Sequence, residues 1–142
     1  MLKPIVAPLA GALLAATLLV AGARAQDDRC VGGQTPGGVI IVLFDRGQSF
    51  LNARAQRELA TITRQAIAQK ANQLCLEGFA DAAAGKTYDL QLAWTRAEAV
   101  ANELATNGYP RDKIVIRKVT DPKRLTARES KTERKVEIRY GR

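Results

Sequence analysis

The stretch Leu74-Cys-Leu-Glu-Gly-Phe-Ala-Asp81 decides the fold of this chain. Its apolar residues predict a strand over 74–79, and Asp81 follows in the loop behind it. Arg96 comes fifteen residues later, in Leu92-Ala-Trp-Thr-Arg-Ala-Glu-Ala-Val100, which predicts the first half of an amphipathic helix. A strand-end carboxylate that faces a helix-borne guanidinium suits a zwitterion, because the acid binds an ammonium group and the arginine a carboxylate. The pair forms such a clamp only if the fold brings the two residues together.

The chain before this stretch predicts one strand and one helix. Residues 38–44 form a β-branched apolar run, so we expect a strand. The run is apolar on both faces, which favours a strand that is central in the sheet or covered on both sides. Asn52 is a good N-cap for the helix that follows, which should end near Asn72. One helical stripe carries its buried side chains: Ala55, Leu59, Ile62 and Ala66.

The chain after this stretch predicts a second helix over residues 88–107, which ends at Asn107-Gly108, and a third strand over 114–117. A charged loop over 121–132 leads to a final strand over 133–140, where apolar and charged residues alternate. The order is β-α-β-α-β-β. It predicts an α+β fold, a two-layer α/β sandwich with both helices on one face of a small mixed sheet.

The N-terminal region has the pattern of a secretory signal peptide over residues 1–25. Lys3 precedes an uncharged apolar stretch, and residues 23–25 have the small-x-small form of a cleavage site. An uncleaved membrane anchor is the alternative, because the stretch is nearly long enough to span a bilayer. No cysteine follows the apolar run directly, so we expect no lipid anchor. Because cleavage removes the apolar stretch, we also expect no transmembrane segment in the mature protein. Residues 26–37 then form an irregular N-terminal segment, and residues 38–142 form one domain.

Charge and cysteine content narrow the class of protein. Removal of the signal takes away Lys3 and Arg24 and lowers the net charge from +8 to +6. A basic surface suits an anionic partner such as a wall polymer, whereas nucleic acid is not expected for an exported protein. A solvated basic face that has no partner is the alternative. Cys30 and Cys75, the only cysteines, predict one disulfide. The chain has no histidine to serve as a base, so we expect no enzyme, no catalytic residue, no metal and no cofactor.

Four motifs, in order, resemble the OmpA-like peptidoglycan-binding domain family over about residues 39–140. In that family a first strand ends in Phe-Asp, a second ends in Gly-His-Thr-Asp, a helix carries Asn-x-x-Leu-Ser-x-x-Arg-Ala-x-x-Val, and the last strand begins Asn-Arg-Arg-Val-Glu-Ile. Here the corresponding residues are Phe44-Asp45, Gly78-Phe-Ala-Asp81, Asp89-Leu-Gln-Leu-Ala-Trp-Thr-Arg96-Ala-Glu-Ala-Val100 and Glu133-Arg134-Lys135-Val-Glu-Ile138. The chain departs from the pattern at Ala80, Asp89, Ala93 and Glu133.

The resemblance implies a site for the diaminopimelate of the peptidoglycan stem peptide. Asp81 would bind its ammonium group and Arg96 its carboxylate, with Asp89, Arg134 and Asp45 as further members of the pocket. A structural ion pair that locks the loop to the helix is the alternative for Asp81 and Arg96.

The implied function is that of an exported periplasmic protein that binds peptidoglycan non-covalently, associated with the outer membrane or the cell wall. The alternative is a structural OmpA-like subunit of a cell-envelope machine, such as a secretion system, a pilus or a motility apparatus. Its pocket would be degenerate, and its partners would be other proteins of the envelope complex.

Overall fold

The computed structural model describes residues 30, 35, 38–80, 86–119 and 133–141. The predicted signal peptide, most of the segment 26–37 and the charged loop 121–132 lie outside these residues. Within them the elements are, in order, β1 (Ile40–Leu43), α1 (Ala53–Ala68), β2 (Gln73–Gly78), α2 (Lys86–Thr106), the 3-10 turn η2 (Arg111–Lys113), β3 (Ile114–Val119) and β4 (Lys135–Gly141). No helix in this described part is long and apolar enough to cross a membrane.

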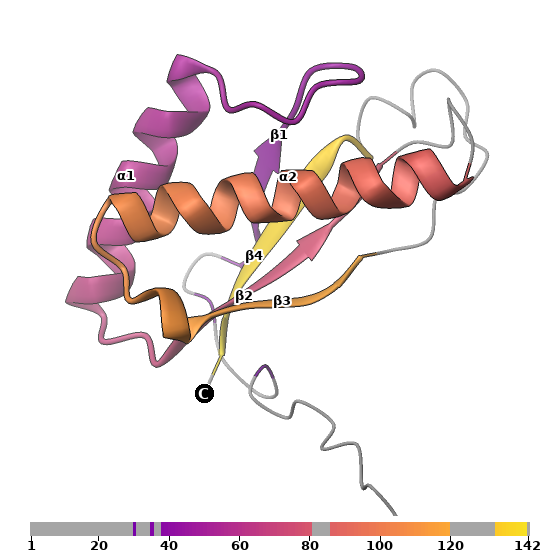
Figure 1. The fold of residues 1–142 in the computed structure, drawn as a ribbon. Coiled ribbons are helices and arrows are strands. Elements are labelled where there is room, and N and C mark those ends of the chain that lie inside the picture. Colours follow the sequence, from indigo (N-terminus) through magenta and orange to yellow (C-terminus); the bar gives the residue numbers. More distant parts are fainter. Residues whose placement is uncertain (1–29, 31–34, 36–37, 81–85, 120–132, 142) are drawn as a thin grey trace, which may run out of the picture.

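The predicted α+β fold is confirmed. The described strands form one sheet in the order β1-β4-β2-β3, with β2 and β3 parallel and the other two pairs antiparallel. Such a sheet is mixed, as expected. Figure 1 shows α2 crossing the sheet and α1 packed beside α2 on the same face. The last strand therefore enters the middle of the sheet, between the first and the second.

The core lies between the sheet and the two helices. It contains fully buried residues from both layers, among them Leu59, Leu74, Leu76, Val100 and Ile138. Gly78, at the end of β2, lets α2 approach the sheet closely, because a methyl group added there would overlap the backbone carbonyl of Ala93. This close approach sets the distance between the end of β2 and the middle of α2, where the candidate site lies.

Helix α1 begins as predicted and ends earlier. The side chain of Asn52 accepts a hydrogen bond of 2.9 Å from the backbone N–H of Ala55. The helix ends at Ala68, and Lys70 adopts a positive φ of 54°. Ile62, on the predicted stripe, packs against the core but is only partly buried. Thr63 is fully buried instead, and its hydroxyl donates to the carbonyl of Leu59 at 2.8 Å, which satisfies it within the helix.

The prediction that the first strand is central or covered on both sides is wrong. β1 is an edge strand, and the side chains of Ile41 and Leu43 are 50% and 59% exposed. Val42 is buried on the helix side, so only one face of β1 is covered. An apolar residue on the second face of a strand does not require a covering layer, because isolated apolar side chains are tolerated at a protein surface.

The predicted disulfide between Cys30 and Cys75 is present. Leu74 and Leu76 face the helices, so Cys75, between them in β2, faces the opposite side of the sheet. The bond therefore ties the N-terminal segment to the sheet face that the helices leave open. Thr35 adds a second tie, because its hydroxyl accepts a hydrogen bond of 2.8 Å from the backbone N–H of Tyr140 in β4.

Candidate functional site

Arg96 is the centre of the candidate site. It lies in the middle of α2 and is fully buried, with no exposed surface. Within the described part of the chain, its guanidinium donates hydrogen bonds to three backbone carbonyls: Nε to Gln48 at 2.8 Å, Nη2 to Asp45 at 3.2 Å and Nη1 to Phe79 at 3.3 Å. The first two acceptors follow β1 and the third follows β2, so one side chain joins the two loops that border the site.

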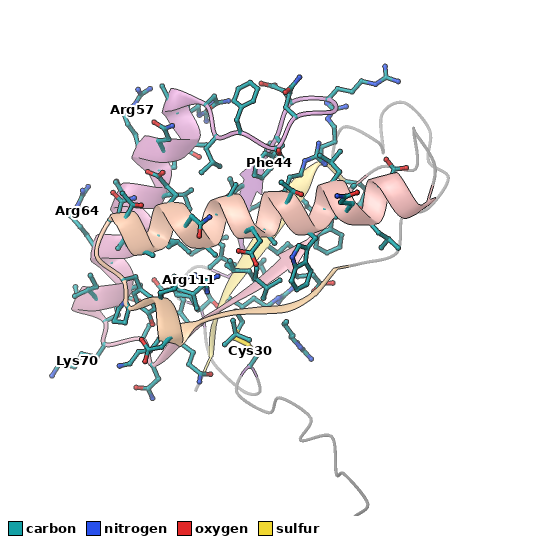
Figure 2. The ribbon with its side chains drawn as sticks, in the orientation of Figure 1. Cys30, Phe44, Arg57, Arg64, Lys70 and Arg111 are labelled. Atoms are coloured by element: carbon teal, nitrogen blue, oxygen red, sulfur yellow. A yellow bond between two sulfur atoms is a disulfide. The ribbon has the colours of Figure 1, made fainter. Side chains whose placement is uncertain are left out.

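The surroundings of Arg96 suit a buried cation. Its guanidinium carbon lies 5.4 Å from the centroid of the Phe44 ring, a cation–π arrangement. Figure 2 shows Phe44 beside α2, at the end of β1. Among the described residues, every buried side-chain nitrogen and oxygen has a hydrogen-bond partner. A buried charge is stable only when it is paired or hydrogen-bonded in this way.

Asp89 is buried on the same side of α2. It lies in the first turn of the helix, seven residues before Arg96, and is 1% exposed. Residues seven apart face the same direction on a helix, so the fold brings the two predicted site residues onto one buried stripe. A carboxylate in the first turn is also favourable for the helix dipole. Asp81 lies outside the described residues, two positions after Phe79 in the sequence, and so does its predicted contact with Arg96.

Asp45 and Arg134 both lie near the end of β1. The Nε of Arg134 donates a hydrogen bond of 3.4 Å to the carbonyl of Phe44. The carbonyl of Arg134 accepts a hydrogen bond of 2.8 Å from the N–H of Phe44. Asp45 is exposed, and both residues line a groove of about 470 Å³. The structure therefore places Asp45 in the loop that Arg96 holds and places Arg134 at the rim of the groove, partly buried.

Two positions where the family pattern has hydroxyls are alanines buried in this structure. Ala80 is 4% exposed and Ala93 is fully buried. Neither can supply a hydrogen bond to a ligand, so the polar contacts of the site depend on charged side chains and on the backbone. Among the described residues, no group of three acids or cysteines is placed to hold a metal ion.

The sequence did not reveal the acceptors of Arg96. Backbone carbonyls carry no residue signature, so nothing in the sequence points to Gln48 or to the carbonyl of Phe79. The Phe-Asp motif marked Phe44 as part of the family pattern. It did not predict that the ring of Phe44 contacts the guanidinium of Arg96.

The comparisons with known proteins agree with this architecture. A family model described as the OmpA family matches residues 43–138. No curated protein sequence matches the chain.

Among solved structures, the peptidoglycan-associated lipoprotein from Burkholderia pseudomallei matches with a TM-score of 0.63 and 18% identity, over 70% of this chain and 88% of that one. The OmpA-like domain of FopA1 from Francisella tularensis matches with a TM-score of 0.62 and 20% identity, over 71% and 70% of the two chains. At these identities the likeness shows the fold alone. The cell wall anchor of the T6SS from Pseudomonas aeruginosa is 26% identical, with a TM-score of 0.55 and coverage of 72% and 80%.

Proposed function

This chain belongs to the OmpA family, and from that premise we propose that it is an exported periplasmic protein that binds peptidoglycan without a covalent bond. The ligand is the diaminopimelate of the stem peptide. The names of two similar structures support this class of ligand, since one is a peptidoglycan-associated lipoprotein and the other a cell wall anchor. The net charge of +6 that is left when the signal, with Lys3 and Arg24, is removed also suits a polyanionic wall.

The position of Arg96 carries the proposal. Its guanidinium joins the loop after β1 to the loop after β2, and the second loop leads to Asp81 two residues beyond the bonded carbonyl of Phe79. A carboxylate that reaches this junction meets a cation already held in a fixed orientation by Nε and Gln48 at 2.8 Å. Such preorganisation lowers the entropy that binding costs.

Ligand binding at Arg96 requires an exchange of hydrogen bonds, because the side chain is fully buried. The bonds to Asp45 and Phe79, at 3.2 and 3.3 Å, are longer than is usual for N–H···O contacts. A ligand carboxylate can replace them with two shorter, charge-assisted bonds from the two Nη atoms, while Nε stays on Gln48. Asp45 is exposed, so its carbonyl can be hydrated when it loses the bond from Nη2.

The remaining residues have separate roles in this proposal. Asp81 binds the ammonium group of the diaminopimelate, and Asp45 and Arg134 contact the neighbouring part of the stem peptide from the groove. Asp89 supports the helix start and keeps the site attractive to the ammonium group. Repeated sites along the wall strengthen weak single contacts by avidity.

One observation favours a second candidate function. Arg96 is fully buried and holds two loops together, which is also what a purely structural arginine does. In that case the chain is a structural subunit of an envelope machine, and its pocket no longer binds the wall. The two candidates differ in what happens when Asp81 loses its charge, because only wall binding requires that carboxylate to meet a ligand.

Co-sedimentation with purified sacculi separates the two functions. Wild type should pellet, and Asp81→Asn should bind about tenfold to a hundredfold more weakly, the range for one charge-assisted hydrogen bond. Arg64→Gln is the matched charge control, since Arg64 is exposed on α1 away from the site, and it should pellet like wild type. Wild type that stays in the supernatant refutes wall binding. Asp81→Asn that pellets like wild type refutes the diaminopimelate assignment.

A further inference from the structure

The free edge of β1 has backbone groups that face away from the sheet. β1 pairs only with β4 in the described part of the chain, in antiparallel register. The N–H of Phe44 donates to Arg134 in β4, and hydrogen-bonded positions alternate along an antiparallel pair. The N–H and C=O groups of Ile41 and Leu43 therefore point outward, where an added strand could bind them.

Two adjoining hollows lie between β1 and α1. The first, of about 470 Å³, includes Ile41, Leu43 and Ala55 in its lining. The second, of about 410 Å³, is lined by Ile40, Ile41 and Ile62 together with polar residues of α1. Because Ile41 and Glu58 line both, the hollows form one continuous groove, which we call the β1–α1 groove. In Figure 1, α2 crosses the sheet whereas α1 lies to the side of it, beyond β1.

A fifth strand would fit this position. It would pair with the outward groups of β1, and every second side chain would point into the β1–α1 groove beneath α1. Those side chains would lie beside Arg57 and Ile62 of α1. The alternate side chains would pack on Ile41 and Leu43, which are 50% and 59% exposed on the opposite face of β1. Edge strands that expose apolar residues and unpaired backbone groups are pairing sites unless charges block them.

The charges beside the groove indicate which strand fits. The exposed side of α1 carries Arg54, Arg57 and Arg64 with Glu58 as its one acid, and Glu58 is paired with Arg54 at 2.8 Å. Figure 2 shows Arg57 and Arg64 extending outward from this helix. A second copy of the chain would bring two such basic helices together, which like-charge repulsion opposes.

We propose that the β1–α1 groove binds an extended acidic segment of another envelope protein, with alternating apolar and acidic residues, as a fifth strand of the sheet. The acidic side chains point toward Arg57 on α1, and the apolar ones pack on Ile41 and Leu43 on the opposite face of β1. This interaction shares its first hollow with the proposed stem-peptide contacts of Asp45 and Arg134. It differs from wall binding because it depends on Ile41, Leu43 and Ile62 rather than on Arg96 and Asp81. Such a partner would hold the protein in an envelope assembly.

The test measures binding of a fluorescein-labelled peptide with alternating Asp or Glu and Val or Ile over nine residues, by fluorescence anisotropy. Leu43→Pro removes one outward N–H but no bond to β4, and it should weaken binding about tenfold. Leu43→Ala, which keeps that N–H, should bind more tightly than Leu43→Pro. Ile41→Asn should also weaken binding about tenfold. Ile67→Asn is its matched control, because Ile67 has the same 50% exposure but lies outside the groove, and it should bind within about twofold of wild type.

Two results overturn the proposal. The first is peptide binding that is absent, or that is unchanged in both Leu43→Pro and Ile41→Asn. The second is a concentration-dependent dimer in sedimentation velocity that Leu43→Pro dissociates, which would make a second copy the occupant. Sacculus binding by Ile41→Asn should equal that of wild type, so failure of the groove proposal and failure of the wall-binding proposal can be told apart.

Discussion

Replacement of Arg96 by methionine tests whether this residue holds the site together. Methionine keeps most of the volume and the apolar stem but removes the three N–H donors to Gln48, Asp45 and Phe79. Hydrogen bonds from a charged donor each contribute about 1.5–3 kcal/mol. The carbonyls of the exposed residues Asp45 and Gln48 can regain water, whereas that of Phe79 is less accessible. We therefore expect a loss of about 3–5 kcal/mol in the free energy of unfolding, below the simple sum of three bonds.

Urea unfolding measures this loss. Trp94 is the single tryptophan and lies on α2 two residues before Arg96, so its fluorescence follows the relevant helix. Arg96→Lys, which keeps the charge but not the fork of donors, should lose about half as much. Arg64→Met is the matched control and should change stability by less than about 0.5 kcal/mol, because Arg64 is exposed. An Arg96→Met variant as stable as wild type would refute the reasoning.

The remaining stability predictions rest on separate contacts. Gly78→Ala should cost about 1–3 kcal/mol by forcing α2 away from β2, and an unchanged melting temperature would show that the close approach is not tight. Cys75→Ser should cost about 4 kcal/mol on the chain-entropy model, because the disulfide spans 45 residues; thermal melts with and without reductant check this. Burial raises the pKa of Tyr109 and of Tyr140 above 10.0. The unfolded chain therefore loses these protons first, and stability should fall as the pH rises past about 10. Tyr109→Phe should make this fall in the urea midpoint shallower, although it also loses the 2.7 Å bond from the tyrosine hydroxyl to Ala71.

The sequence pattern was enough to predict the order of the elements and the placement of both helices on one face of the sheet. The buried residues Leu59 and Ala66 fall on the stripe predicted for the first helix, and Val136 and Ile138 are buried apolar residues of the alternating last strand. Burial on one face leaves a period of 3.6 in a helix and of 2 in a strand. The place of β1 in the sheet was not predictable in this way. An apolar run such as 38–44 reads the same in a central strand and in an edge strand with one exposed face, and strand order depends on long-range pairing.

The candidate site was predictable only in part. The motif match identified Arg96 as a site residue, but not that it would be fully buried. The burial of its charge depends on groups from other elements, which include the backbone carbonyls of Asp45, Gln48 and Phe79. Asp89 was expected to lie at the pocket. Its burial, with only 1% exposed, was not predicted, because it depends on how the start of α2 packs against the rest of the fold. Side-chain type can be read from a sequence, whereas backbone acceptors are supplied by the tertiary structure.

A titration with meso-diaminopimelate, followed by amide chemical shifts in NMR, tests the central claim most directly. We predict saturable shifts at Asp45, Gln48 and Phe79, whose carbonyls Arg96 bonds in the free protein, because the ligand carboxylate would displace two of these bonds. Asp81→Asn should remain folded and should bind at least about tenfold more weakly. If the three amides stay unshifted in wild type up to the solubility limit of the ligand, the claim that Arg96 forms part of a diaminopimelate site is contradicted.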